Sequence, residues 1–101
     1  MILDYFYYNK GLHKIEIEAV ESHFGVTYID ILGRAHSFIN GHKSFDFIYE
    51  RGHCAIVAEK GNFDDKDLKV LLIHKMQLQA DSLMNEVKEL YLMVGDLQHE
   101  S

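Results

Sequence analysis

Apolar side chains in the last third of the chain recur at alternating intervals of three and four residues, from Ile73 to Leu97. This spacing is the a/d pattern of a coiled-coil seam, which is narrower than the apolar face of an ordinary amphipathic helix. Mostly β-branched residues stand at the a positions, with Met or Leu at the d positions, and this combination favours two strands. The pattern predicts a homodimer interface made by Met76, Ala80, Leu83, Val87, Leu90, Val94 and Leu97.

The helix that carries this seam is predicted over residues 64–101. Asp64 or Asp65 can cap its amino terminus, and Gly95 is the expected residue just past its carboxy terminus. About thirty helical residues give a rod of roughly 45 Å, which is longer than a compact domain of about 100 residues is wide. We therefore expect the first turns, where residues 70–73 are all apolar, to dock on the rest of the chain and the remainder to meet a second chain.

Other arrangements of this helix fit the same pattern. The helix could lie across a sheet of its own chain in a monomer, which would cover the seam without a partner. The flanking e and g positions carry little charge, so they do not distinguish parallel pairing, antiparallel pairing or a four-helix arrangement. These flanking residues include Gln77, Gln79, Met84, Tyr91 and Met93.

Residues 1–63 are predicted to form an antiparallel β-sheet domain. Apolar and polar residues alternate over 2–8 and 12–20, which predicts a hairpin in which Tyr8 faces Leu12. Glycines then recur every eight to eleven residues between segments rich in Ile, Val, Phe and Tyr, as a series of tight reversals requires. The further candidate strands are 26–32, 35–39, 42–49 and 53–59. The predicted class is α+β, an antiparallel β-meander of five to six short strands packed on one long C-terminal α-helix.

The turns at Gly33, Gly41 and Gly52 set the expected strand pairing, because a slip of one residue would turn every side chain to the other face. The three expected pairs across these turns are Leu32 with Ala35, Ile39 with His42, and Tyr49 with His53. In these registers one face of the sheet collects the larger apolar side chains, which are Ile29, Ile31, Phe38, Phe45, Phe47, Ala55 and Val57.

Two segments of this domain permit other interpretations. The run from Tyr5 to Tyr8 is aromatic on both faces, so it forms either an exposed interface patch or a central strand covered on both sides. Residues 13–24 also permit a helix, because several of their apolar positions fit a helical spacing.

The sequence EAVESHFGVTYIDILGR, residues 18–34, resembles the opening helices of the DNA-binding domain of bacterial replication initiators. The similarity covers less than a fifth of the chain and rests on Val20, Phe24, Gly25, Val26, Asp30, Leu32 and Gly33. It implies an all-α fold that binds DNA. The later signature of that family, a turn glycine and an Arg-Asp-His-Thr run, is absent from this sequence, so no functional residue is carried over.

The chain is acidic, with a formal net charge of −6 from ten basic and sixteen acidic residues. Residues 64–101 carry four basic against eight acidic residues and are the more acidic part. Nucleic-acid binding draws on clustered basic residues, and no such run occurs, so direct nucleic-acid binding is not expected. An acidic surface favours instead a protein partner with a basic surface.

Hydropathy and cysteine content predict a cytoplasmic protein. No apolar run approaches the length of a transmembrane helix, and the first ten residues lack the basic start of a signal peptide, so neither a membrane span nor export is expected. The single cysteine, Cys54, excludes an internal disulfide and is compatible with a reducing compartment.

The sharpest candidate for chemistry is a metal site built from His36, His42, His53 and Cys54. Tetrahedral zinc needs three or four such ligands to converge. In the expected registers these side chains diverge, so no metal and no cofactor is predicted. Cys54 has no neighbouring base in the sequence, and Asp46 with His36 is a kind of acid–base pair that any acidic, histidine-rich domain offers. We predict no catalytic residue and no enzyme activity.

The favoured function is a small acidic non-enzymatic protein–protein interaction module, homodimeric through its C-terminal helix, acting as an inhibitor or adaptor of phage or mobile-element type. A first alternative is a helical nucleic-acid-binding regulator, which would need a basic face. A second alternative is a histidine-dependent hydrolase, which would need at least three histidines within ligand distance of one another. The basic face that the nucleic-acid-binding alternative needs would consist of Lys10, Lys14, Arg34, Lys43 and Arg51.

Overall fold

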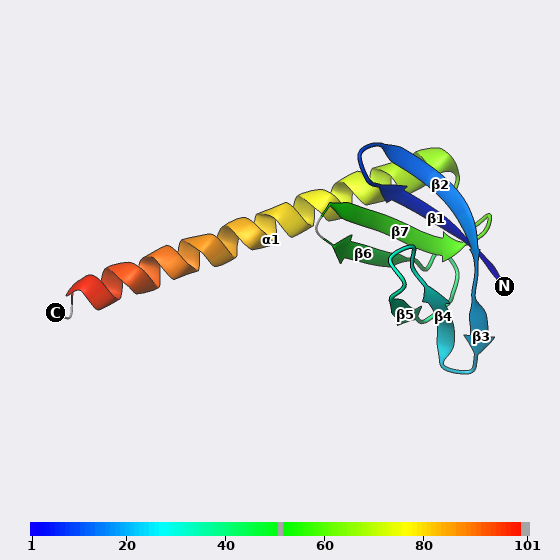
Figure 1. Ribbon diagram of the computed structural model, residues 1–101, viewed down its shortest axis with the longest axis horizontal. Coiled ribbons are helices and arrows are strands. Elements are labelled where there is room, and N and C mark those ends of the chain that lie inside the picture. The colour runs from blue at the N-terminus through cyan, green and yellow to red at the C-terminus, as the bar shows by residue number, and fades with distance from the viewer. Residues whose placement is uncertain (51, 100–101) are drawn as a thin grey trace.

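The computed structural model describes residues 1–50 and 52–99, and within them the side chains at all positions except 89, 90, 97 and 99. Over these residues the chain forms seven strands and one helix (Figure 1). The elements are β1 (Ile2–Tyr8), β2 (Leu12–Glu18), β3 (Val20–Ser22), β4 (Gly25–Ile29), β5 (Ala35–Phe38), β6 (Asp46–Glu50), β7 (His53–Glu59) and α1 (Asp65–His99). The predicted α+β class, antiparallel strands with one long C-terminal helix, is confirmed, and the all-α alternative is wrong.

The strands form two antiparallel sheets rather than one continuous meander. The larger sheet has the order β2-β1-β7-β6, and the smaller sheet has the order β3-β4-β5. β1 therefore pairs with the last strand of the chain as well as with its neighbour β2. Only Ala19 separates β2 from β3, and its amide donates to the Met1 carbonyl oxygen at 2.9 Å, so the chain crosses between the sheets without a loop.

The central strands of the larger sheet are buried on both faces. In β7 the side chains of Ala55 and Val57 face the smaller sheet, whereas those of Cys54 and Ile56 face α1. β1 alternates in the same way, and its Phe6 faces α1. The aromatic run of β1 thus belongs to a central strand covered on both sides, which was one of its two predicted interpretations.

Two apolar cores result, one on each face of the larger sheet, so the molecule has three layers (Figure 1). The core between the sheets is formed by Leu3, Tyr5, Val26, Tyr28, Ile48, Ala55 and Val57. The core between the larger sheet and α1 is formed by Phe6, Cys54, Ile56, Leu68 and Leu72.

α1 docks on the larger sheet through its first turns only. Asp64 caps the helix as predicted, because its carboxylate accepts a hydrogen bond from the Asp67 amide at 2.8 Å. Leu68 and Leu72, one turn apart, are 0% and 1% exposed, whereas Val70 between them is 58% exposed. The docked face is therefore a single stripe and not the whole circumference of the helix.

α1 continues past Gly95 to His99, so the predicted end of the helix is wrong. Glycine in a helix interior costs about 1 kcal/mol relative to alanine, but a long helix gains one further hydrogen bond with each added residue and tolerates that cost. The molecule measures 59 × 31 × 25 Å, and its radius of gyration is 17.5 Å. A compact domain of this length would have about 13 Å. The carboxy-terminal half of α1 accounts for the difference, because it projects away from both sheets (Figure 1).

The register of the first hairpin is confirmed, with Tyr8 paired to Leu12 and Asp4 paired to Glu16. The helical interpretation of residues 13–24 is wrong, because this segment lies in β2 and β3 and in the turn that leads to β4. The resemblance to replication initiators does not extend to the structure, since residues 20–22 and 25–29 are strands.

The predicted register between the fourth and fifth strands is wrong. Ile29, not Leu32, pairs with Ala35. The reason is the Asp30 carboxylate, which accepts the amides of Leu32 and Arg34 at 2.8 and 2.9 Å and closes a loop directly after Ile29. This side chain replaces the ladder hydrogen bonds that a longer strand would have made.

The register of the last hairpin differs from the prediction by one residue, because His53 pairs with Glu50 rather than with Tyr49. The shift brings Phe45 and Phe47 to the core beneath α1 instead of the face that carries Ala55 and Val57 in β7. Packing against the helix thus sets this register.

The Asn40-Gly41 signal does not close a hairpin, because β5 and β6 belong to different sheets. Ile39 and His42, which were expected to pair, both lie outside the strands. The Ser44 amide donates to the Gly41 carbonyl oxygen at 3.2 Å, and Lys43 adopts a φ of 58°. Asn40 and Gly41 therefore lie in the loop that connects β5 of the smaller sheet to β6 of the larger sheet.

Leu72→Ala should lower the free energy of unfolding by about 2 to 5 kcal/mol, because it leaves a cavity where the helix docks on the sheet. Leu78→Ala makes the same chemical change at a position of α1 that is 48% exposed, and it should cost less than about 1 kcal/mol. Urea unfolding followed by circular dichroism compares the two variants. Equal losses would contradict the docking of α1 through a single stripe.

Candidate interaction surface

The docked stripe of α1 continues along the part of the helix that projects from the sheets. At 3.6 residues per turn, a position 11 residues further on points within about 20° of the same direction. Leu83 therefore lies on the same side of α1 as Leu72, and Val87 and Val94 follow close to this line. We call residues 80–99 the projecting segment, and Leu83, Val87 and Val94 the projecting stripe.

The side chains of the projecting stripe are about half exposed. The exposed fractions are 41% for Leu83, 47% for Val87 and 50% for Val94. All three were predicted interface residues, and they lie on one side of the helix. The same apolar face that the sheet covers in the first turns is thus left in solvent beyond the sheet.

The other predicted interface residues divide into two groups. Met76 packs against the core beneath α1, and Ala80 lies where the helix leaves the sheet. The side chains of Leu90 and Leu97 lie outside the part of the chain that the structure describes.

An apolar hollow of about 120 Å³ lies between α1 and the end of the larger sheet, at the point where the helix leaves it. Its walls combine one face of the helix with the ends of β6 and β7. The lining residues are Tyr49, Cys54, Met76, Gln79, Ala80 and Leu83. The contributions of Tyr49 and Cys54 were missed in the sequence analysis, because they depend on how the sheet meets the helix.

A row of apolar side chains crosses the larger sheet at this same end. Leu12, Tyr8, Cys54 and Tyr49 are successive partners across β2, β1, β7 and β6. Directly paired residues project to the same face of a sheet, and Cys54 faces α1. Leu12, Tyr8 and Tyr49 are exposed, whereas Cys54 is buried. We call these four residues the end row.

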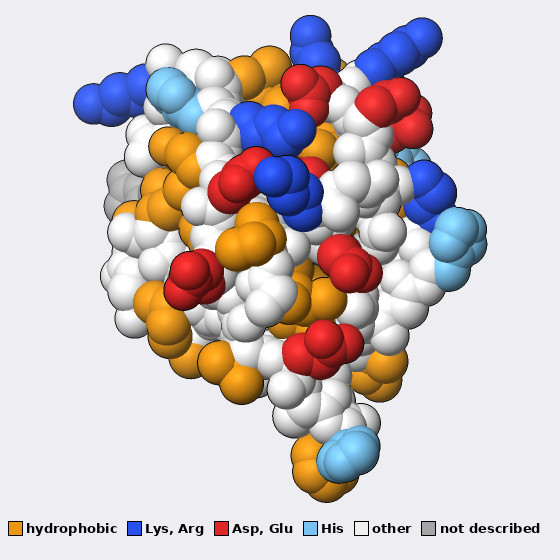
Figure 2. Space-filling model, turned by 90° about the vertical axis from the view of Figure 1, so that its right-hand side faces the viewer, with side chains coloured by type: hydrophobic (Ala, Val, Ile, Leu, Met, Phe, Trp, Pro, Cys, Tyr) orange, Lys and Arg blue, Asp and Glu red, His pale blue; other side chains and the backbone are white. Residues whose placement is uncertain are grey.

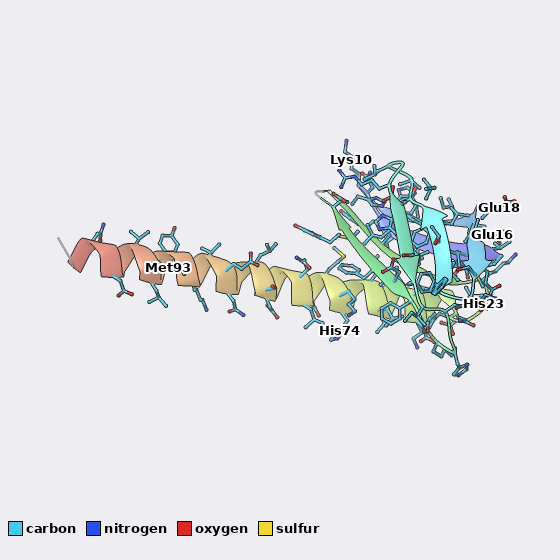
Figure 3. All side chains as sticks on the ribbon, turned by 90° about the horizontal axis from the view of Figure 1, so that it is seen from below. Lys10, Glu16, Glu18, His23, His74 and Met93 are labelled. Atoms are coloured by element: carbon cyan, nitrogen blue, oxygen red, sulfur yellow. The ribbon has the colours of Figure 1, made fainter. Side chains whose placement is uncertain are left out.

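The projecting segment is apolar on several sides near its carboxy terminus. Tyr91, Leu92 and Met93 are all exposed beside Val94. Figure 3 shows Met93 on the projecting segment, far from both sheets. Met84, one turn before Lys88, is exposed as well. Met84, Tyr91 and Met93 flank the projecting stripe, whereas Leu92 lies on the opposite face of α1.

Basic side chains of the sheet domain are paired with acids at several points. Lys14 binds Asp65 at 2.5 Å, and this hydrogen bond raises the pKa of Lys14. Arg34 binds Glu50. Figure 2 shows basic side chains gathered near the top of this view, with acidic ones among and below them. Of the five residues proposed for a basic face, two are therefore paired with carboxylates, and Arg51 lies outside the described residues.

Tyr5 and His53 form a hydrogen bond of 2.7 Å inside the core between the sheets. Burial raises the pKa of Tyr5 to about 12 and lowers the pKa of His53. His53 is 2% exposed, and its Nδ1 atom has no hydrogen-bond partner among the described residues. Because a protonated ring would be poorly solvated there, the neutral form is favoured. This pair is enclosed by the fold, so it serves packing rather than contact with a substrate.

Two carboxylates, the buried Asp30 and the half-buried Asp46, hold the smaller sheet in place. Asp30 binds His36 at 2.6 Å and accepts two backbone amides. Burial acts to raise the pKa of Asp30, but these hydrogen bonds outweigh it, and the pKa lies below its usual value. Asp46 accepts a hydrogen bond from the Tyr28 hydroxyl at 2.7 Å. The pairing of Asp46 with His36 considered from the sequence is therefore wrong, because each group has a different partner.

The described residues contain no group of three His, Cys, Asp or Glu side chains that could hold a metal ion. His53 faces the core between the sheets and its neighbour Cys54 faces α1, so these two point to opposite sides of β7. Burial raises the pKa of Cys54, which keeps the thiol in its neutral, less nucleophilic form.

Comparison with known proteins gave no match to a family model, to a curated protein or to a solved structure. Within the described ranges, no helix combines the length and the apolar character needed to cross a lipid bilayer. The projecting stripe, the hollow and the end row together form one apolar surface where α1 leaves the larger sheet.

Mild acid should destabilise the fold through His53. Its pKa in the folded state is lowered by burial below the unfolded value of about 6.5. The unfolded chain therefore binds this proton more tightly, and the free energy of unfolding falls as the pH drops below that value. We expect His53→Gln to lose less stability than the wild type between about pH 7 and pH 5 in urea unfolding.

The matched control is His23→Gln, which alters an exposed histidine in the turn between β3 and β4 (Figure 3). This variant should follow the wild-type pH dependence. Equal losses of stability in the wild type and in both variants would mean that His53 has the same pKa in the folded and the unfolded chain. That result would contradict the lowered pKa of His53 in the fold.

Proposed function

We propose that this protein is a non-enzymatic protein–protein interaction module that forms a homodimer through the projecting segment of α1. The observation that carries the proposal is the half-exposed projecting stripe, which continues the face that the sheet buries in the first turns. A second copy offers the same stripe, so each helix can cover the other.

Burial of the stripe supplies the free energy of association. Covering a half-exposed Leu or Val contributes about 1 kcal/mol, and a symmetric pair buries the stripe twice. Met84, Tyr91 and Met93 beside the stripe add to this area. Association costs roughly 4 to 15 kcal/mol in lost freedom. Because this cost is similar in size to the gain, we expect a dimer that dissociates on dilution.

We further infer a cytoplasmic protein that engages a second protein with a basic surface, as an inhibitor or adaptor. The net charge of −6 supports electrostatic attraction to such a partner. Asp81, Glu86 and Asp96 against Lys88 give the projecting segment an acidic balance among its described side chains. The buried free thiol of Cys54 is compatible with a reducing compartment.

Nucleic-acid binding, the alternative function, draws less support from the surface. Lys14 and Arg34 already bind carboxylates, and such pairs reduce the positive potential available to a phosphate backbone.

Leu83→Asp combined with Val87→Asp should convert a dimer into a monomer, because it places two charges in the apolar interface. The measurement is light scattering after size exclusion at several protein concentrations. The wild type should approach twice the chain mass of 11.7 kDa at high concentration, and the variant should stay at the chain mass.

Leu78→Asp combined with Leu92→Asp is the matched control, since both residues lie on the face of α1 opposite the projecting stripe. This variant should remain dimeric. A wild type that stays monomeric at every concentration, or equal masses for the two double variants, would contradict the proposed dimer.

A further inference from the structure

We propose that the two copies pair with their helices antiparallel, so that the end of each helix docks on the end row of its partner. This inference rests on the proposed dimer. It adds the direction of pairing and a second contact surface, the end row with its hollow.

A parallel pair is excluded by the position of the sheets. The docked stripe and the projecting stripe lie on the same side of α1, so a partner helix must approach from the side that the larger sheet occupies. Paired helices run about 8 to 10 Å apart. In a parallel pair, both larger sheets would therefore have to fit between the helices near Leu68 and Leu72. An antiparallel pair places the two domains at opposite ends, where they do not meet.

The partner helix of an antiparallel pair enters the same layer as the larger sheet. The partner helix lies against the projecting stripe in the same way as the larger sheet lies against Leu68 and Leu72. The end of the partner helix therefore meets the end of the sheet. The structure presents apolar surface at that place. Tyr8 and Tyr49 of the end row are 43% and 46% exposed there, and the hollow beside Cys54 opens between Tyr49 and α1.

The length of the projecting segment sets the register. Residues 80–97 span about 27 Å, and their full overlap brings Leu83 of one copy opposite Val94 of the other. The same overlap places Met84 beside Tyr91, so apolar side chains at the flanks meet one another. Glu86 is the one charged residue at the flanking positions of this overlap, and it faces Met93 rather than a like charge. The last turn of the partner helix then ends over the hollow.

Disulfide trapping tests the direction of pairing. Leu83→Cys and Val94→Cys are each made in a Cys54→Ala background, mixed to allow exchange, and oxidised with copper phenanthroline. In an antiparallel pair, position 83 of one copy meets position 94 of the other, and the mixture should yield a covalent heterodimer identified by its mass. Each variant oxidised alone should stay non-covalent. In an antiparallel pair, position 83 of one copy lies about 16 Å along the helix axis from position 83 of the other, and the same holds for position 94. A disulfide needs Cα atoms within about 7 Å.

The control pair is Asn85→Cys with Leu92→Cys, which has the same axial relation on the outer face of α1 and should not cross-link. Self-cross-linking of Leu83→Cys alone would show parallel pairing and overturn the inference. A wild-type dimer whose 83 and 94 variants form no heterodimer would overturn it as well. A monomeric wild type in light scattering would instead remove the proposed dimer itself.

Substitution in the end row tests the second contact. Tyr49→Glu should raise the dissociation constant of the dimer at least about tenfold, which corresponds to about 1.4 kcal/mol. Ile29→Glu, at an exposed apolar position of the smaller sheet, should leave it unchanged. Tyr49→Ser repeats the test without an added charge, and circular dichroism checks that each variant is folded. An unchanged dissociation constant for both Tyr49 variants would overturn docking on the end row.

Discussion

Leu68 and Leu72 hold α1 against the larger sheet through a contact that excludes water from both surfaces. This contact involves one face of the first turns only. Because an α-helix is stiff over many turns, fixing one face near its start also fixes the direction of every later side chain. The position of Val94, far from the sheet, thus follows from leucines near the start of the helix. The exposed apolar surface of the projecting segment is thus set by the same contact that completes the core beneath α1.

The sheet domain uses its polar groups for its own assembly. The Tyr5–His53 and Tyr28–Asp46 hydrogen bonds satisfy groups that the joining of the two sheets would otherwise leave unpaired. Asp30 closes the loop after β4. Among the described residues, the buried side chains of Asp30 and His53 each have a hydrogen-bond partner within the domain. The projecting segment lacks comparable support, although most helical stability in proteins comes from tertiary packing of an amphipathic face. A second helix would supply the missing contacts.

The sequence predicted those features that depend on neighbouring residues. The alternation of apolar and polar residues over 2–8 and 12–20 predicted the first register, Asp64 predicted the helix start, and the three-and-four spacing predicted the stripe. Features that depend on distant residues were not predicted. The pairing of β1 with β7 and the shift of Phe47 toward α1 are decided by packing between layers. The end row combines residues from four strands, so no local pattern could reveal it.

Hydrogen exchange across residues 80–97, measured at a low and a high protein concentration, tests most directly whether the projecting segment is covered by a second copy. Pairing predicts that the amides of this segment become more protected as the concentration rises, while those of β1 and β7 keep the same protection at both concentrations. Rapid exchange of residues 80–97 at every concentration would contradict it, because the stripe would then stay in solvent in a solitary chain.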